Sequence, residues 1–132
     1  MIIDASNAEI INTKEVCMHD DILKELCFIR HEKKLQLLML REEVFKRYTV
    51  DFFRVIGFEM TACDFWGRAP HILDFEYVER KNNTLIPKLF EKKEKGNYKY
   101  SSLRNQEDYI ETVITFSSGD QLRIACESIV II

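Results

Sequence analysis

Residues 109–126 read YIETVITFSSGDQLRIAC, and this stretch decides the fold class. From Tyr109 to Phe116 the side chains alternate between two faces and are rich in β-branched residues, as in a strand. Residues 117–120 (SSGD) supply a turn, and the alternation resumes from Gln121 to Cys126. The pattern predicts a β-hairpin.

The flanking sequence repeats this alternation. Strands are predicted over residues 48–53, 58–63 and 73–78, and the apolar residues 129–132 (IVII) predict a closing strand inside the sheet. We therefore expect a mainly β fold, an antiparallel sandwich or a partly open barrel, in one domain spanning residues 1–132.

Two segments have helical features. Thr84 is placed to cap a short helix that runs to about Lys93, with Pro87 in its first turn. Residues 22–45 fit two strands around a polar turn, but their Leu, Gln, Met, Glu and Lys residues also favour a helix. Periodicity leaves these two alternatives open for residues 22–45.

Composition excludes several classes of protein. The hydrophobic fraction of 46% and charged fraction of 31% are typical of a folded domain. A net charge of −3 argues against a nucleic-acid partner, since phosphate recognition needs clustered Lys and Arg. The apolar runs fall short of the ~20 residues that a membrane helix needs, and no secretory signal is evident. We expect a soluble, cytoplasmic, bacterial protein without a membrane partner.

The most unusual segment runs from Cys63 to His71, beside the predicted strand 58–63. It holds the single Trp among acidic, basic and imidazole groups, and loops of this kind often carry binding residues. We predict a binding surface that also includes residues 19–20; its residues are Asp64, Trp66, Arg68, His71, His19 and Asp20. In the alternative interpretation, Phe65 and Trp66 fill one end of the core.

The residue types for catalysis are present, but their spacing is not. Cys63, His71 and His19 include thiol and imidazole groups, yet zinc ligands usually come in close pairs such as C-x-x-C. The four glycines are isolated, so no phosphate-binding loop is present. We expect neither a metal nor a cofactor, and no enzymatic activity.

Three stretches together resemble a group of small uncharacterised bacterial proteins, some of which look like immunity proteins of polymorphic or contact-dependent toxins. The stretches are residues 19–22 (HDDI), residues 61–67 (TACDFWG) with Pro70 and His71, and residues 118–126 (SGDQLRIAC). The resemblance spans most of residues 16–132. It implies a mostly antiparallel β fold, which favours a hairpin over residues 22–40, and it implies binding rather than catalysis.

Three functional hypotheses follow. The first is a domain that binds a protein partner. The resemblance implies that this partner is a toxin domain, which the protein neutralises. The second is a small-molecule or metal-dependent enzyme centred on Cys63, Asp64 and His71 with His19. The third is a structural or homo-oligomerisation module that uses the closing strand as a pairing edge.

The cysteines at positions 17, 27, 63 and 126 are irregularly spaced, and we expect all four to be reduced. Thiol titration of the denatured, unreduced protein should therefore find four reactive groups. A result of two or none would indicate disulfides.

Overall fold

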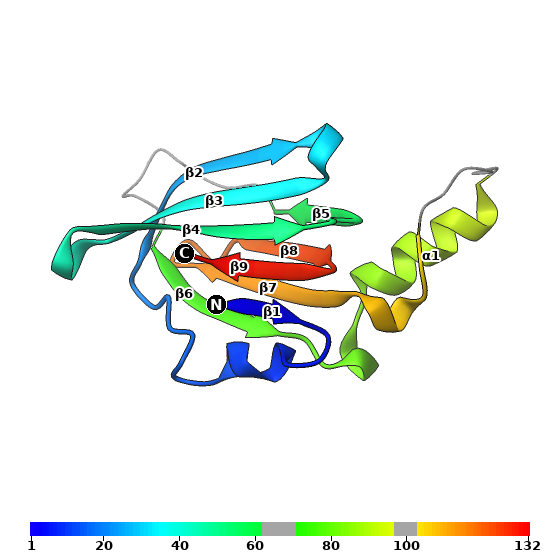
Figure 1. Ribbon diagram of the computed structural model, residues 1–132, viewed down its shortest axis with the longest axis horizontal. Coiled ribbons are helices and arrows are strands. Elements are labelled where there is room, and N and C mark those ends of the chain that lie inside the picture. Colours follow the sequence, from blue (N-terminus) through cyan, green and yellow to red (C-terminus); the bar gives the residue numbers. More distant parts are fainter. Residues whose placement is uncertain (62–70, 97–102) are drawn as a thin grey trace.

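The computed structural model describes residues 1–61, 71–96 and 103–132, and these form two antiparallel sheets and one α-helix (Figure 1). The first sheet contains, in spatial order, β1 (Ile2–Asp4), β9 (Ser128–Ile131), β4 (Lys46–Phe53), β3 (Lys34–Arg41) and β2 (Ile22–Ile29). The second contains β5 (Gly57–Met60), β8 (Gln121–Cys126), β7 (Ile110–Phe116) and β6 (Ile72–Tyr77). The helix, α1, spans Leu85–Lys95.

The two sheets bury a common core between them. Strands β3 and β4 contribute Leu35, Leu37 and Phe52, all fully buried, and the second sheet contributes Phe116 and further apolar side chains of β7 and β8. The rings of Phe52 and Phe75 meet edge to face across the layers, with centroids 6.4 Å apart. Because both sheets are antiparallel and strand is the dominant structure, the predicted mainly β class is confirmed.

Residues 22–40 form the β2–β3 hairpin rather than a helix. Every second residue of β3 is fully buried, beginning with Leu35 and Leu37, and this two-residue period is that of a strand with one face on the core. Tertiary packing thus overrides the helical propensity of the individual residues. The hairpins over residues 109–126 and the strand at 48–53 are also present as predicted.

The closing strand β9 is an interior strand. It pairs with β1 through Ile3 and Ile129, and with β4 through Phe52 and Ile129. Its backbone is therefore bonded on both sides, and the hypothesis that it serves as a free edge for pairing with a second copy is wrong.

The β3–β4 hairpin projects beyond the other strands at the end of the molecule opposite α1 (Figure 1). Its turn is a 3-10 segment, η3 (Glu42–Val44), followed by Phe45 in the left-handed conformation at φ 50° and ψ 36°. The β2–β3 turn is built in the same way, from η2 (Arg30–Glu32) and Lys33 at φ 51° and ψ 39°. The two turns are structural equivalents with different side chains.

Helix α1 packs on the outer face of the second sheet, where its apolar side chains Leu85 and Ile86 are buried with Tyr109 and Ala125. The predicted helix is thus present, but Thr84 does not cap it with its side chain. The capping group is the carboxylate of Glu111 on β7, which accepts hydrogen bonds from the backbone N–H groups of Thr84 (3.0 Å) and Ile86 (2.8 Å).

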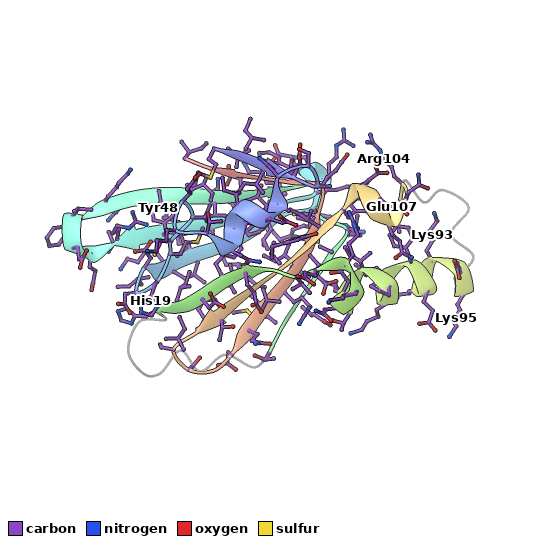
Figure 2. The ribbon with its side chains drawn as sticks, turned by 90° about the horizontal axis from the view of Figure 1, so that it is seen from below. His19, Tyr48, Lys93, Lys95, Arg104 and Glu107 are labelled. Carbon is purple, nitrogen blue, oxygen red and sulfur yellow. The ribbon has the colours of Figure 1, made fainter. Side chains whose placement is uncertain are left out.

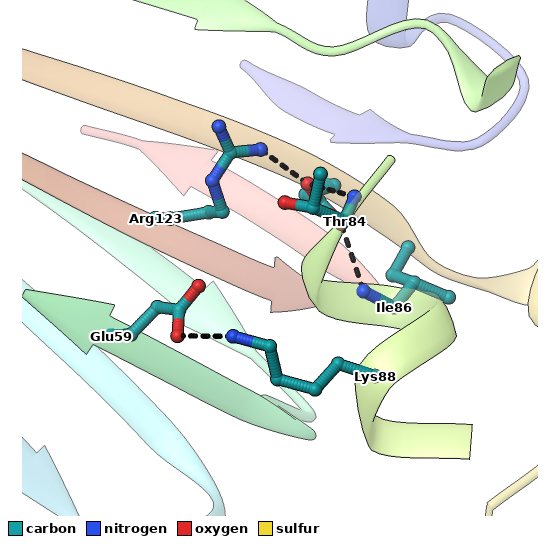
Figure 3. Close-up of polar contacts among 6 residues, drawn as sticks. Glu59, Thr84, Ile86, Lys88 and Arg123 are labelled. Carbon is teal, nitrogen blue, oxygen red and sulfur yellow. Dashed lines mark hydrogen bonds and ion pairs between the residues drawn. The ribbon is translucent and has the colours of Figure 1, made fainter. Parts of the chain in front are cut away.

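Glu111 is fully buried, and its charge is balanced by Arg123 on the neighbouring strand β8. Figure 3 shows Arg123, Thr84 and Ile86 around this carboxylate, with the exposed pair of Glu59 and Lys88 nearby. A carboxylate at a helix N-terminus also interacts favourably with the helix dipole. One side chain of the sheet therefore fixes where α1 begins.

We expect Glu111→Ala to lower the free energy of unfolding by about 3–5 kcal/mol, because it removes the cap and leaves Arg123 without its partner. Urea denaturation measures this. The control is Glu59→Ala, which removes an exposed ion pair with Lys88 and should cost no more than about 1 kcal/mol. Equal losses in the two variants would contradict the assigned role of Glu111.

Candidate functional site

The structure brings together the two segments from which the sequence predicts a site. The backbone N–H of Asp20 donates to the carbonyl of Ile72, and the N–H of Ile72 donates to the carbonyl of Asp21, both at 2.8 Å. Ile22 forms an isolated antiparallel bridge with His71. The segment that carries His19 and Asp20 therefore runs beside the segment that follows His71.

Residues 62–70 lie outside the described part of the chain. Of the predicted binding residues, Asp64, Trp66 and Arg68 belong to this range, as does Cys63 of the alternative enzyme hypothesis. The structure places the remaining three, His19, Asp20 and His71, at the same end of the sandwich.

His19 is fixed in one orientation. Its Nδ1 lies 2.9 Å from the carbonyl oxygen of Leu73, and because a carbonyl only accepts, Nδ1 carries the proton. The other ring nitrogen, Nε2, lies 3.6 Å from the Asp20 carboxylate. Both side chains are largely exposed, and Asp20 adopts the left-handed conformation at φ 68°, which aspartate tolerates better than most residues.

Beneath these groups lies a polar cluster formed by the buried residues Asp21 and Tyr48 and the partly exposed Arg41. Arg41 donates from Nε (3.2 Å) and from a terminal nitrogen (3.0 Å) to the two carboxylate oxygens of Asp21, which is only 3% exposed. The Tyr48 hydroxyl donates to the same carboxylate, and the guanidinium lies over the Tyr48 ring at 5.5 Å. Figure 2 shows His19 and Tyr48 at the same end of the molecule, away from the helix residue Lys95.

The cluster shifts the proton affinity of two of its members. Burial and the hydrogen bond to Asp21 raise the pKa of Tyr48 well above its ordinary value. The hydrogen bond to Asp21 also raises the pKa of Arg41, whose terminal nitrogen additionally donates to the carbonyl of Cys17 at 2.8 Å. The hydrogen bonds of the cluster tie the segment before β2 to the base of the β3–β4 hairpin.

Asp21, Arg41 and Tyr48 were not among the residues that the sequence singled out. The missed signal is on the hairpin, since Met39 pairs with Tyr48 and Arg41 lies two residues further along on the same face. An arginine and a tyrosine on the inner face of a predicted sheet require a polar partner, and Asp21 is that partner.

A hollow of about 290 Å³ opens above the cluster, between the segment before β2 and the hairpin turn. The residues that line it are Cys17, His19, Asp20, Asp21, Arg41, Glu42 and Glu43. Four carboxylates thus face one guanidinium, and that guanidinium is already paired with Asp21. The hollow therefore carries a surplus of negative charge.

Beside the hollow, the tip of the hairpin exposes two apolar side chains. Val44 is 64% exposed and Phe45 is 85% exposed, the largest exposure of any large hydrophobic residue in the described part of the chain. We define the hairpin tip as residues 42–45. The apolar side chains of the hairpin tip lie outside the core. The stability of the fold therefore does not explain why they are apolar.

A larger hollow, of about 920 Å³, lies at the opposite end of the hairpin strands. Its central acidic group, Glu127, is bound by Arg54 at 3.2 Å and by Arg104 at 2.9 Å. Asp4 accepts hydrogen bonds from Ser6. The carboxylates of Glu127 and Asp4 in this hollow are therefore already bound by groups of the protein itself.

Neither metal ligation nor membrane insertion is evident in the described residues. They contain no group of three or more His, Cys, Asp or Glu side chains arranged to hold a metal ion. None of their helices is both long and apolar enough to cross a membrane. Cys17, Cys27 and Cys126 are free thiols, and Cys63 lies outside the described range.

No family model matches the sequence, and no curated protein does. A solved structure with a similar fold is that of an uncharacterized protein from Neisseria gonorrhoeae. The match has a TM-score of 0.53 and 13% sequence identity, and it covers 87% of this chain and 92% of the other. At that identity the likeness concerns the fold alone.

The raised pKa of Tyr48 predicts a pH dependence of stability. Above about pH 10 an unfolded chain releases the tyrosine proton while the folded protein retains it, so the free energy of unfolding should fall as pH rises, by up to about 1.4 kcal/mol per pH unit. We expect Tyr48→Phe to lose less stability than the wild type between pH 9 and pH 11.5. Urea denaturation at each pH measures this.

Tyr77→Phe is the matched control, because the Tyr77 hydroxyl forms no hydrogen bond among the described residues, and its pH profile should follow that of the wild type. Identical profiles for Tyr48→Phe and the wild type would show that the buried cluster does not retain the proton.

Proposed function

We propose that this chain is a protein-binding domain whose contact surface is the hairpin tip together with the adjoining segment 19–20. The observation that carries the proposal is Phe45, whose side chain is 85% exposed on a backbone in the left-handed conformation. A bulky residue in this conformation is uncommon and costs roughly 1–2 kcal/mol. Folding therefore gives no reason for a phenylalanine at this position.

The equivalent β2–β3 turn supports this interpretation. There the left-handed position is occupied by Lys33, a polar residue suited to an exposed turn. Both turns close with the same hydrogen bond, from the residue at the left-handed position to the carbonyl three residues earlier, at 3.2 Å. This turn conformation thus forms without an aromatic side chain. An exposed aromatic residue on a rigid hairpin is suited to insertion into an apolar pocket of a partner.

Within this class we propose toxin neutralisation as the specific role. It rests on the resemblance of residues 19–22, 61–67 and 118–126 to small uncharacterised bacterial proteins, some of which look like immunity proteins. A compact β domain that presents one rigid hairpin suits a protein that blocks another by occupying its surface. The partner would be the toxin domain encoded by the gene immediately upstream.

The enzyme hypothesis has less support. His71 and His19 lie on adjacent segments, but the His19 ring is held by the Leu73 carbonyl and faces Asp20 rather than a thiol. No observation on the described residues favours catalysis over binding at this end of the molecule.

The substitution Phe45→Asn separates binding from folding. Asparagine accepts the left-handed conformation, so the free energy of unfolding should stay the same or rise by up to about 1 kcal/mol. Binding to the upstream gene product, measured by calorimetry, should fall at least about 100-fold, as expected for loss of an aromatic anchor. Protection of cells that express that product should be lost as well.

Lys33→Asn is the control, since it makes the same replacement at the equivalent turn and should leave both binding and protection intact. If the wild-type protein does not bind the upstream product, toxin neutralisation is contradicted. If Phe45→Asn binds as well as the wild type, the hairpin tip is not the contact surface.

A further inference from the structure

The surface around the hairpin tip carries negative charge that the protein itself does not neutralise. Asp20 has a side chain 76% exposed, and its one ionic neighbour is the His19 ring, which is charged only when protonated. Glu42 and Glu43 are exposed and form no ion pair with any described residue. Three carboxylates therefore surround the hollow without a fixed cationic partner among the described residues.

No lysine or arginine in the described part of the chain forms an ion pair with Asp20, Glu42 or Glu43. Arg41 lines the hollow, but both of its bonds to Asp21 and its bond to the Cys17 carbonyl direct its guanidinium towards the buried cluster. Lys46 and Arg47 follow the tip at the start of β4, outside the lining of the hollow. A partner that approaches the tip thus meets an apolar anchor beside an acidic hollow.

We propose that the partner is a protein with a basic surface, and that it places an arginine side chain in this hollow while Phe45 enters an apolar pocket beside that arginine. This inference rests on the proposed function, because it names the chemistry of the partner at the same surface. Charge complementarity carries it: opposite charges across an interface select the partner and accelerate association.

Arginine fits this hollow better than lysine does. A volume of about 290 Å³ admits one long side chain. The planar guanidinium can bind a carboxylate through two parallel hydrogen bonds and can stack on an aromatic ring, whereas an ammonium group cannot do either as well. Carboxylates of Glu42, Glu43 and Asp20 and the exposed ring of His19 provide both kinds of contact.

The two segments that form the hollow are joined to each other and to β6 in the absence of a partner. Asp21 and Arg41 join the segment before β2 to the base of the hairpin, and the backbone of Asp20 is bonded to β6 through Ile72. Little conformational freedom is then lost on binding, which favours affinity. The site therefore needs no rearrangement of these segments to accept a side chain.

The test is an NMR titration of the uniformly labelled protein with N-acetyl-arginine amide under reducing conditions. We expect saturable shifts of the backbone amides of residues 17–21 and 41–43, with a dissociation constant of about 1–10 mM for this single side chain. N-acetyl-citrulline amide has the same shape without the charge, and it should produce no saturable shift at these residues.

Two variants locate the effect. The double variant E42Q/E43Q should bind the arginine probe with an affinity at least about fivefold lower than that of the wild type. Glu32→Gln, at the equivalent β2–β3 turn, should leave that affinity unchanged. Shifts spread evenly over all acidic residues, or equal responses to the arginine and citrulline probes, would overturn the proposal.

The outcome is distinguishable from a failure of the proposed function. If Phe45→Asn abolishes binding of the upstream product while the arginine probe does not bind, the hairpin tip remains the contact surface and the basic partner is excluded. If the probe binds as expected while Phe45→Asn does not change binding of the upstream product, the hollow is an arginine-binding site and the contact surface for that product lies elsewhere.

Discussion

Asp21 is almost completely removed from solvent, and a buried carboxylate is costly unless its charge and its oxygens are both satisfied. Arg41 and Tyr48 meet that requirement with three hydrogen bonds, and they come from the two strands of the projecting hairpin. The segment before β2 is therefore attached to the hairpin at its base. The position of the hollow between this segment and the hairpin depends on this attachment.

Glu111 plays the same part at the other end of the molecule. It is a carboxylate on a strand, it is paired with an arginine on the adjacent strand, and it holds an element that the sheet alone would not position. In both places, the element that is held lies outside the regular pairing of the strands. Buried acids thus supply the geometry that hydrogen-bonded ladders cannot provide.

Alternation of side chains was sufficient to predict most of the strands, because a strand with one face on the core shows its period directly, as β3 does. It could not decide between hairpin and helix for residues 22–40, since Leu, Met, Gln, Glu and Lys suit either conformation and only long-range packing selects one. The interior position of β9 was predicted from the apolar residues 129–132, but its neighbours β1 and β4 were not, because apolar composition does not say which strands it pairs with.

The site was predicted in part. His19, Asp20 and His71 were chosen for their chemistry, and the pairing of residues 20–22 with 71–72 places them at one end. Phe45 was not identified, because its significance comes from its backbone conformation and exposure rather than from its residue type. Likewise, Thr84 has the right type for a helix cap, but a group distant in sequence takes that role.

The location of β9 between β1 and β4 has a consequence for synthesis on the ribosome. In the described part of the chain β1 pairs with residues 128–130 and with no other strand, so the first sheet cannot close until this distant segment has left the exit tunnel. Until then β4 has an unfilled edge, and the nascent protein presents it to solvent and to other chains. Such long-range closure slows folding and prolongs the time during which the edge of β4 is unpaired.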